Sequence, residues 1–188
     1  MTCMIPRTAR THPDAGVRYP REIAAAVTLP AACAALVTPG TAPLPRTAAI
    51  AVTTACAALA TRLALVSFLA AADRPEPRSV RPHDPFHEPT PPALLGLGPA
   101  PDRDRLRTAG DRCADAWRQW RSADATADTS DGSAGALSVA AWCSWALGSP
   151  VRAQIRARYA LDVRPDDPLA GLVLRSVRAG SVPGWERR

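Results

Sequence analysis

The stretch SVAAWCSWALGSPVRAQ, from Ser138 to Gln154, decides how the C-terminal part of this chain folds. Gly148 is the residue type that ends a helix in the left-handed conformation. Ser149 can cap a new helix, and Pro150 suits its first turn, where no amide donor is missed. The stretch therefore predicts a helical hairpin, with one helix over 134–147 and a second starting at Pro150.

The two tryptophans of this stretch belong to one face of the first predicted helix. Val139, Trp142, Trp145 and Ala146 follow each other at steps of three and four residues, which is the spacing of a buried helical stripe. Cys143 is predicted to point away from that stripe. The pattern favours a packing surface over a reactive Cys-Ser site.

Two further helices are predicted around the hairpin. Asp167 is placed to cap a helix that begins at Pro168 and ends at Gly180. Upstream, Asp102 is a natural cap for an amphipathic helix over 103–121, on which the hairpin is expected to pack. The predicted structural seam between these helices consists of Trp117, Trp120, Trp142 and Trp145.

The N-terminal half reads as a second, Ala-rich helical part. Residues 21–37 and 46–72 are predicted to form two helices, the first kinked or divided by Pro30. Residues 73–101 contain nine prolines and are predicted to be an extended connector at a boundary. The fold class predicted is all-α. The predicted division is a flexible arm (1–20), an Ala-rich helical segment (21–72), a Pro-rich linker (73–101) and a helical module (102–188).

Composition restricts the class of protein further. The 188 residues carry 23 basic and 17 acidic side chains, a net charge of +6, and every basic residue is Arg. The five cysteines are scattered and odd in number, which is typical of free thiols in a reducing, cytoplasmic compartment. Aromatic residues make up only 5% of the chain, too few for a platform that stacks nucleic-acid bases.

The segment 23–72 raises the alternative of membrane attachment, because it contains no acidic residue. Within it, residues 47–72 are long enough to span a bilayer, and their eight large apolar residues favour insertion by roughly 0.3–0.6 kcal/mol each. Arg62 opposes insertion by roughly 2.5–3.5 kcal/mol, and several threonines add to that cost. The balance is near zero, so the sequence favours a soluble helical pair and leaves membrane attachment or export as the minority interpretation.

The C-terminal region resembles two known patterns. Its helices and Pro-containing turn have the period of a tetratricopeptide repeat, as a single hairpin without the large aromatic positions. Residues of about 103–188 also resemble the C-terminal helical region of the bacterial family called domain of unknown function forty-one ninety-two. The matching positions are Ala140, Trp142, Gly148, Ala153, Pro165, Asp166, Leu169, Ala170, Gly180 and Pro183. The resemblance implies a helical fold and no particular activity.

The sequence contains no catalytic constellation, and we predict no metal and no cofactor. His83 and His87 are four residues apart, but Pro85 between them prevents the helix that would present both to one zinc ion. Cys113 is predicted on an apolar stripe. No His lies in the C-terminal module to activate it or any serine.

The function predicted is therefore a non-enzymatic helical module that binds a protein partner or another domain. One alternative is a nucleic-acid-associated accessory protein that uses a ridge of arginines to contact phosphates. The arginines of that ridge would be Arg152, Arg156, Arg175 and Arg178. A second alternative is a protein attached to a membrane through residues 23–72.

Overall fold

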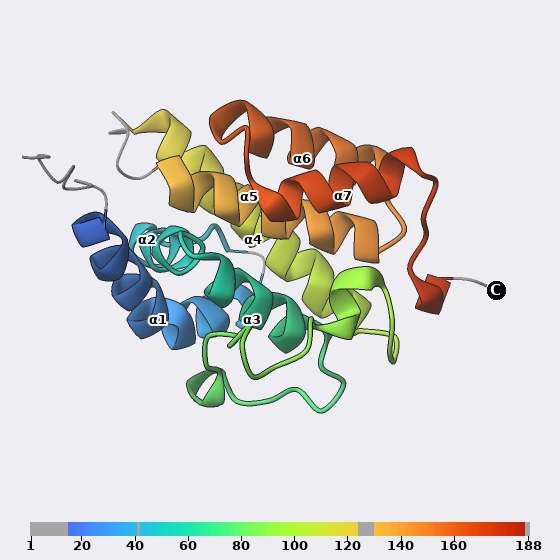
Figure 1. Cartoon of the computed structure of the whole chain (residues 1–188), viewed down its shortest axis with the longest axis horizontal. Coiled ribbons are helices and arrows are strands. Elements are labelled where there is room, and N and C mark those ends of the chain that lie inside the picture. Colours follow the sequence, from blue (N-terminus) through green and yellow to red (C-terminus); the bar gives the residue numbers. More distant parts are fainter. Residues whose placement is uncertain (1–14, 41, 124–129, 187–188) are drawn as a thin grey trace, which may run out of the picture.

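The fold is all-α, as predicted. The structure, a computed structural model, describes residues 15–40, 42–123 and 130–186, and within these ranges it has seven α-helices and no strand. Short 3-10 turns, η1 (Pro77–Ser79), η2 (Pro92–Leu95) and η4 (Gly184–Glu186), lie in the connections. The helices are α1 (Ala15–Val37), α2 (Arg46–Ala55), α3 (Leu59–Ala70), α4 (Arg103–Ser122), α5 (Ser130–Ala146), α6 (Pro150–Val163) and α7 (Pro168–Arg178) (Figure 1).

Helix α5 is the centre of the molecule. It packs against α4, α6 and α7, and on its other side against α2 and α3. Every residue from Gly132 to Ala146 is buried. A helix that is apolar on all sides belongs in the core. Cys143, which was predicted to point away from the tryptophan stripe, is also fully buried, because α5 has no exposed face in this region.

Two glycines allow α5 to approach α2 closely. A Cβ atom on Gly132 would lie 2.2 Å from the carbonyl oxygen of Thr53, and one on Gly135 would lie 2.0 Å from that of Cys56. No side chain fits at either position. Helix α5 begins at Ser130, whereas the sequence predicted a start at 134, so Gly132 lies in its first turn.

The predicted helix over 46–72 is two helices. The chain breaks at residues 56–58, where Ala58 is extended (φ −106°, ψ 144°), and α2 and α3 meet at an angle of 112°. The Thr61 hydroxyl donates to the carbonyl oxygens of Ala55 and Ala58 and so joins the two sides of the break. The bend turns α3 into the core, where eight of its residues are buried.

The Pro-rich segment is packed, whereas the sequence predicted an extended connector. His83, Pro91, Leu94 and Pro101 are buried, and the His83 amide donates to the carbonyl oxygen of Ala60 at the start of α3 (3.1 Å). The segment thus lies against the outer side of α3. Buried apolar residues from both sides of it, from Leu29 to Leu174, belong to one hydrophobic cluster.

Most predicted helix ends are confirmed. The Asp102 carboxylate accepts from the amides of Asp104 and Arg105, and that of Asp167 accepts from the amide of Ala170. Gly148 and Gly180 follow α5 and α7 with φ values of +70° and +64°, which favour glycine. Ser149 occupies the cap position of α6 but makes no side-chain capping hydrogen bond.

The first helix is longer than predicted. It begins at Ala15, inside the segment predicted as an arm, and contains both Pro20 and Pro30. Residues 1–14, the rest of that predicted arm, lie outside the described residues. Of the described helices, α1 has an 18-residue window (Pro20–Val37) long and apolar enough to cross a membrane, with 28% of that window buried. Helices α2 and α3 meet the same criterion only as a bent pair.

Candidate protein-interaction site

Helix α6 carries three of its large apolar residues on the outside, whereas Leu161 near its end packs against the core. Ala153, Ala157 and Ala160 face the core and are fully buried, whereas Val151, Ile155 and Tyr159 are exposed to 72%, 51% and 47%. In a surface helix of a monomer the larger apolar side chains normally face the core. We call Val151, Ile155 and Tyr159 the outer stripe of α6. Their spacing of four residues places them in one continuous row along the helix.

The outer stripe continues onto α4 through aromatic contacts. The rings of Tyr159 and Trp117 have their centroids 5.6 Å apart and are tilted by 38°. The Arg121 guanidinium lies 4.5 Å from the centre of the Trp117 ring, a cation–π contact. The stripe therefore ends in an ordered aromatic pair covered by a positive charge.

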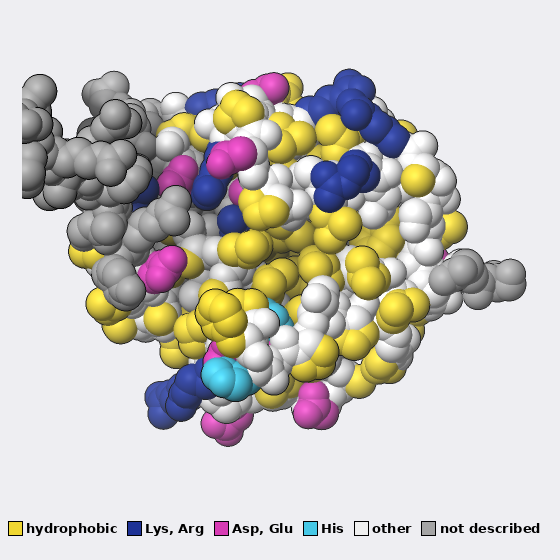
Figure 2. Space-filling model, viewed as in Figure 1, with side chains coloured by type: hydrophobic (Ala, Val, Ile, Leu, Met, Phe, Trp, Pro, Cys, Tyr) yellow, Lys and Arg dark blue, Asp and Glu magenta, His cyan; other side chains and the backbone are white. Residues whose placement is uncertain are grey.

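Two other groups of exposed apolar residues are built differently. Ile23, Val27 and Ile50 come from two helices, α1 and α2. Leu95, Leu97 and Val182 come from two loops, which are joined by a 2.7 Å hydrogen bond from the Gly184 amide to the Gly96 carbonyl. Hydrophobic side chains also spread over the middle of the face seen in Figure 2, between α7 and α3. Among the residues that the structure describes, α6 is the one helix on which three large exposed apolar residues form a single row.

Arg156 does not belong to an exposed basic ridge. Its side chain is only 15% exposed. One terminal nitrogen, Nη1, donates to the Ala140 carbonyl (3.2 Å) and the Ser144 hydroxyl (2.9 Å), and the other donates to the Asp111 carboxylate (2.8 Å). This guanidinium ties α6 to α5 and α4, so its donors are already used within the protein.

The other three arginines of the predicted ridge are exposed on two helices. Arg152 lies on α6, and Arg175 and Arg178 lie in the last turn of α7. Arg158 is a further exposed arginine on α6. None of these four forms an ion pair with a described residue, and basic side chains are visible over the α6–α7 edge of the molecule (Figure 2).

The four tryptophans of the predicted seam occupy different parts of the core. Trp142 is fully buried, and its indole N–H has no hydrogen-bond partner among the described residues. Trp145 donates to the Ser181 carbonyl (2.9 Å), which holds the C-terminal segment against α5. Trp117 is buried beside Tyr159, and Trp120 packs at the edge of the core.

A buried ion pair joins the two halves of the chain. Arg62 of α3 and Asp167, at the turn between α6 and α7, are bonded to each other with side chains only 1% and 0% exposed. Arg62 also donates to the Ser138 hydroxyl of α5 (3.2 Å) and, through Nε, to the Ala58 carbonyl (3.4 Å). Asp167 in turn caps α7 by accepting a hydrogen bond from the Ala170 amide. This pair connects three helices and holds the α6–α7 turn in place.

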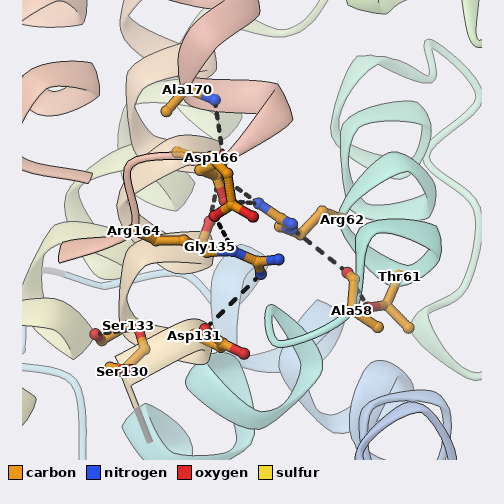
Figure 3. A network of polar contacts seen from close by, with 12 residues as sticks. Ala58, Thr61, Arg62, Ser130, Asp131, Ser133, Gly135, Arg164, Asp166 and Ala170 are labelled. Atoms are coloured by element: carbon orange, nitrogen blue, oxygen red, sulfur yellow. Dashed lines mark hydrogen bonds and ion pairs between the residues drawn. The ribbon is translucent and has the colours of Figure 1, made fainter. Parts of the chain in front are cut away.

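The same network reaches the surface through Arg164. Its guanidinium lies 3.9 Å from the Asp131 carboxylate at the start of α5, and its Nε donates to Asp166 (3.1 Å) (Figure 3). Asp131 also accepts from Arg21 of α1 (3.1 Å). Asp166 is 80% exposed, so this outer part is far more hydrated than the buried pair.

The described cysteines are unsuited to nucleophilic chemistry. Cys33, Cys56, Cys113 and Cys143 are buried free thiols. Burial raises the pKa of Cys33, Cys56 and Cys143 to about 12, and that of Cys113 well above its ordinary value. Because the thiolate is the nucleophile, these side chains stay protonated and inert at neutral pH.

We expect these four thiols to resist modification in the folded protein. In a Cys3→Ser variant, a disulfide reagent that labels thiols should react slowly at pH 8 and at pH 10, because the folded-state pKa values remain above both. In denaturing urea all four thiols should react at once, and faster at pH 10, since exposed thiols ionise near pH 8.5. Rapid labelling of a native thiol at pH 8 would show that it is accessible and ionised.

Histidines and carboxylates do not form a metal centre in the described part of the chain. His83 is buried, with its Nδ1 2.9 Å from Glu88, whereas the exposed His87 has its Nδ1 2.6 Å from Asp84. No group of three or more His, Cys, Asp or Glu side chains within the described ranges is arranged to hold a metal ion. The two histidines thus belong to two separate pairs.

No family model, no curated protein and no solved structure matches this chain. The resemblance of residues 103–188 to the bacterial family, and that of the hairpin to a tetratricopeptide repeat, therefore stay predictions.

Proposed function

We propose that this protein is a non-enzymatic helical interaction module that binds a protein partner through the outer stripe of α6. The observation that carries the proposal is the inverted polarity of α6, with alanines toward the core and Val151, Ile155 and Tyr159 toward solvent. Large apolar residues in a continuous exposed row are typical of a surface that another protein covers. Tyr and neighbouring Arg side chains are also the residue types enriched in such contacts.

The geometry of α6 supports this use. Its core side is fixed by small residues and by the three hydrogen bonds of Arg156, so the helix presents the stripe on a rigid support. Helices that present anchors at i, i+4 and i+8 are a common way to bind another helix. The module would thus act by holding a partner and not by chemistry on a substrate.

Binding should depend on the stripe and not on exposed apolar residues in general. We expect the full chain to capture a defined set of proteins from a lysate of the organism that makes it. The variant Val151→Gln, Ile155→Gln, Tyr159→Gln should capture at least one protein of that set in an amount lower by about tenfold or more. A loss of this size is usual when central anchors of an interface are removed. Mass spectrometry of the captured proteins measures the loss.

The matched control changes three apolar residues of similar exposure on α1 and α2. The variant Ile23→Gln, Val27→Gln, Ile50→Gln, at positions exposed to 61%, 74% and 56%, should capture the same partners as the unchanged chain. Both variants should stay folded. The free energy of unfolding of the stripe variant should fall by about 0.5–1.5 kcal/mol, because this variant loses the aromatic contact between Tyr159 and Trp117. Equal capture by all three proteins would exclude α6 as the binding surface.

Nucleic-acid binding through the arginine ridge receives less support. Arg156 is occupied by internal hydrogen bonds, and Arg175 and Arg178 lie on a different helix from Arg152. Membrane attachment through residues 23–72 is also less supported, because Arg62 and most of α3 are buried against the C-terminal helices.

A further inference from the structure

We infer that the partner of the α6 stripe is an acidic amphipathic helix; this inference rests on the proposed function and names the chemistry of its ligand. On a helix that turns about 100° per residue, Arg158 and Arg152 lie on opposite sides of the row formed by the outer stripe. Both are exposed, and neither forms an ion pair with a described residue. An apolar row between two free positive charges is complementary to an apolar row between two negative ones.

The remaining charges of α6 leave this pattern in place. Arg156 is neutralised by Asp111, and Asp162 lies one turn beyond the end of the stripe. At the α4 end, Arg121 covers the Trp117 ring beside Tyr159 and adds a third positive charge near the row. A partner helix would therefore meet positive charges on both sides of the stripe, with Arg121 and Asp162 both near its Tyr159 end.

A second copy of this chain fits the surface less well. A two-fold antiparallel pair of α6 helices centred on Ile155 would bring the Arg158 side chains of both copies to one flank of the interface and both Arg152 side chains to the other. Like charges that face each other across an interface disfavour the pair, and this acts against self-association. A helix with glutamates in place of these arginines removes the repulsion and supplies two ion pairs.

A designed peptide pair tests this inference directly. The first peptide is a labelled amphipathic helix of about 20 residues, with leucines at i, i+4 and i+8 and glutamates on both sides of that row. The second has glutamine at each glutamate position. Fluorescence anisotropy with the full chain should show that the glutamate peptide binds about tenfold more tightly at about 50 mM salt, with a smaller difference at about 300 mM.

Substitutions then assign the binding to α6. Arg152→Glu with Arg158→Glu should weaken binding of the glutamate peptide by about tenfold or more. The matched control, Arg175→Glu with Arg178→Glu, makes the same change of net charge at two exposed arginines of α7 and should alter the affinity by less than about twofold. The stripe variant should remove binding of both peptides.

Three outcomes would overturn the inference. The first is equal affinity of the unchanged chain for both peptides. The second is an equal loss of affinity for the glutamate peptide in the two arginine variants, and the third is no binding of that peptide by the unchanged chain. If capture from the lysate still depends on the stripe, the proposed function stands and only the acidic helix is wrong. Stripe-dependent binding to vesicles with about one-third phosphatidylserine, without binding of the peptide, would point to a lipid surface instead.

Discussion

Replacing Asp167 with alanine should lower the free energy of unfolding by about 3–5 kcal/mol. The change removes one partner of a fully buried ion pair, which leaves the Arg62 guanidinium charged and uncompensated in the core. It also removes the cap of α7, where the carboxylate accepts from the Ala170 amide. Urea unfolding followed by circular dichroism measures the loss.

The adjacent residue provides the control. Asp166 is 80% exposed and pairs with the partly exposed Arg164, so Asp166→Ala should change the free energy of unfolding by less than about 1 kcal/mol. The double variant Arg62→Met, Asp167→Asn removes both charges and keeps an oxygen for the cap. It should be more stable than Asp167→Ala, because no lone charge stays buried. Equal losses in Asp166→Ala and Asp167→Ala would contradict the role given to the buried pair.

Replacing Gly135 with alanine should destabilise the protein by about 3 kcal/mol, the upper end of the usual cost of overpacking. The new Cβ atom would lie 2.0 Å from the Cys56 carbonyl oxygen and 3.1 Å from Cδ of Arg62. Backbone cannot move aside as a side chain can, so α5 and α2 must separate. The measurement is again urea unfolding, with thermal unfolding as a second readout.

Gly171 is the matched control for this substitution, since it also lies within a helix. A Cβ atom there would meet only the end of the flexible Arg175 side chain, at 3.3 Å. Gly171→Ala should therefore leave stability unchanged or raise it by up to about 1 kcal/mol, because alanine favours helix more than glycine does. If both glycine variants behaved alike, the close approach of α5 to α2 would be refuted.

The C-terminal helices could be predicted from sequence because their ends carry local signals. The residues at these ends act through groups only a few residues away in the chain, so their places in the sequence indicate their roles. They are Asp102, Gly148, Asp167 and Gly180. The break at residues 56–58 has no such signal. It contains neither Gly nor Pro, and the bend becomes favourable only through the tertiary packing of α3.

The candidate site was harder to predict, because the exposed residues of α6 depend on which face of this helix packs against the core. The sequence shows Val151, Ile155 and Tyr159 on one stripe and alanines on another, and the larger residues would normally be assigned to the core. Only the packing of α5 against the alanines shows the reverse. The Arg62–Asp167 pair had one usable signal. Arg62 lies among apolar residues in a segment without acids, so its charge, once buried, needs an acid from elsewhere in the chain.

The most direct test of the proposed interaction site is photo-crosslinking inside the organism that makes the protein. A photoreactive benzophenone amino acid would replace Ile155 in one version of the full chain and Val27, an exposed apolar residue of α1, in another. We expect a discrete adduct with another protein at position 155 and none at position 27. The crosslinked segment should be an acidic helix. An adduct at position 27 alone, or none at either position, would contradict the assignment of α6 as the docking surface.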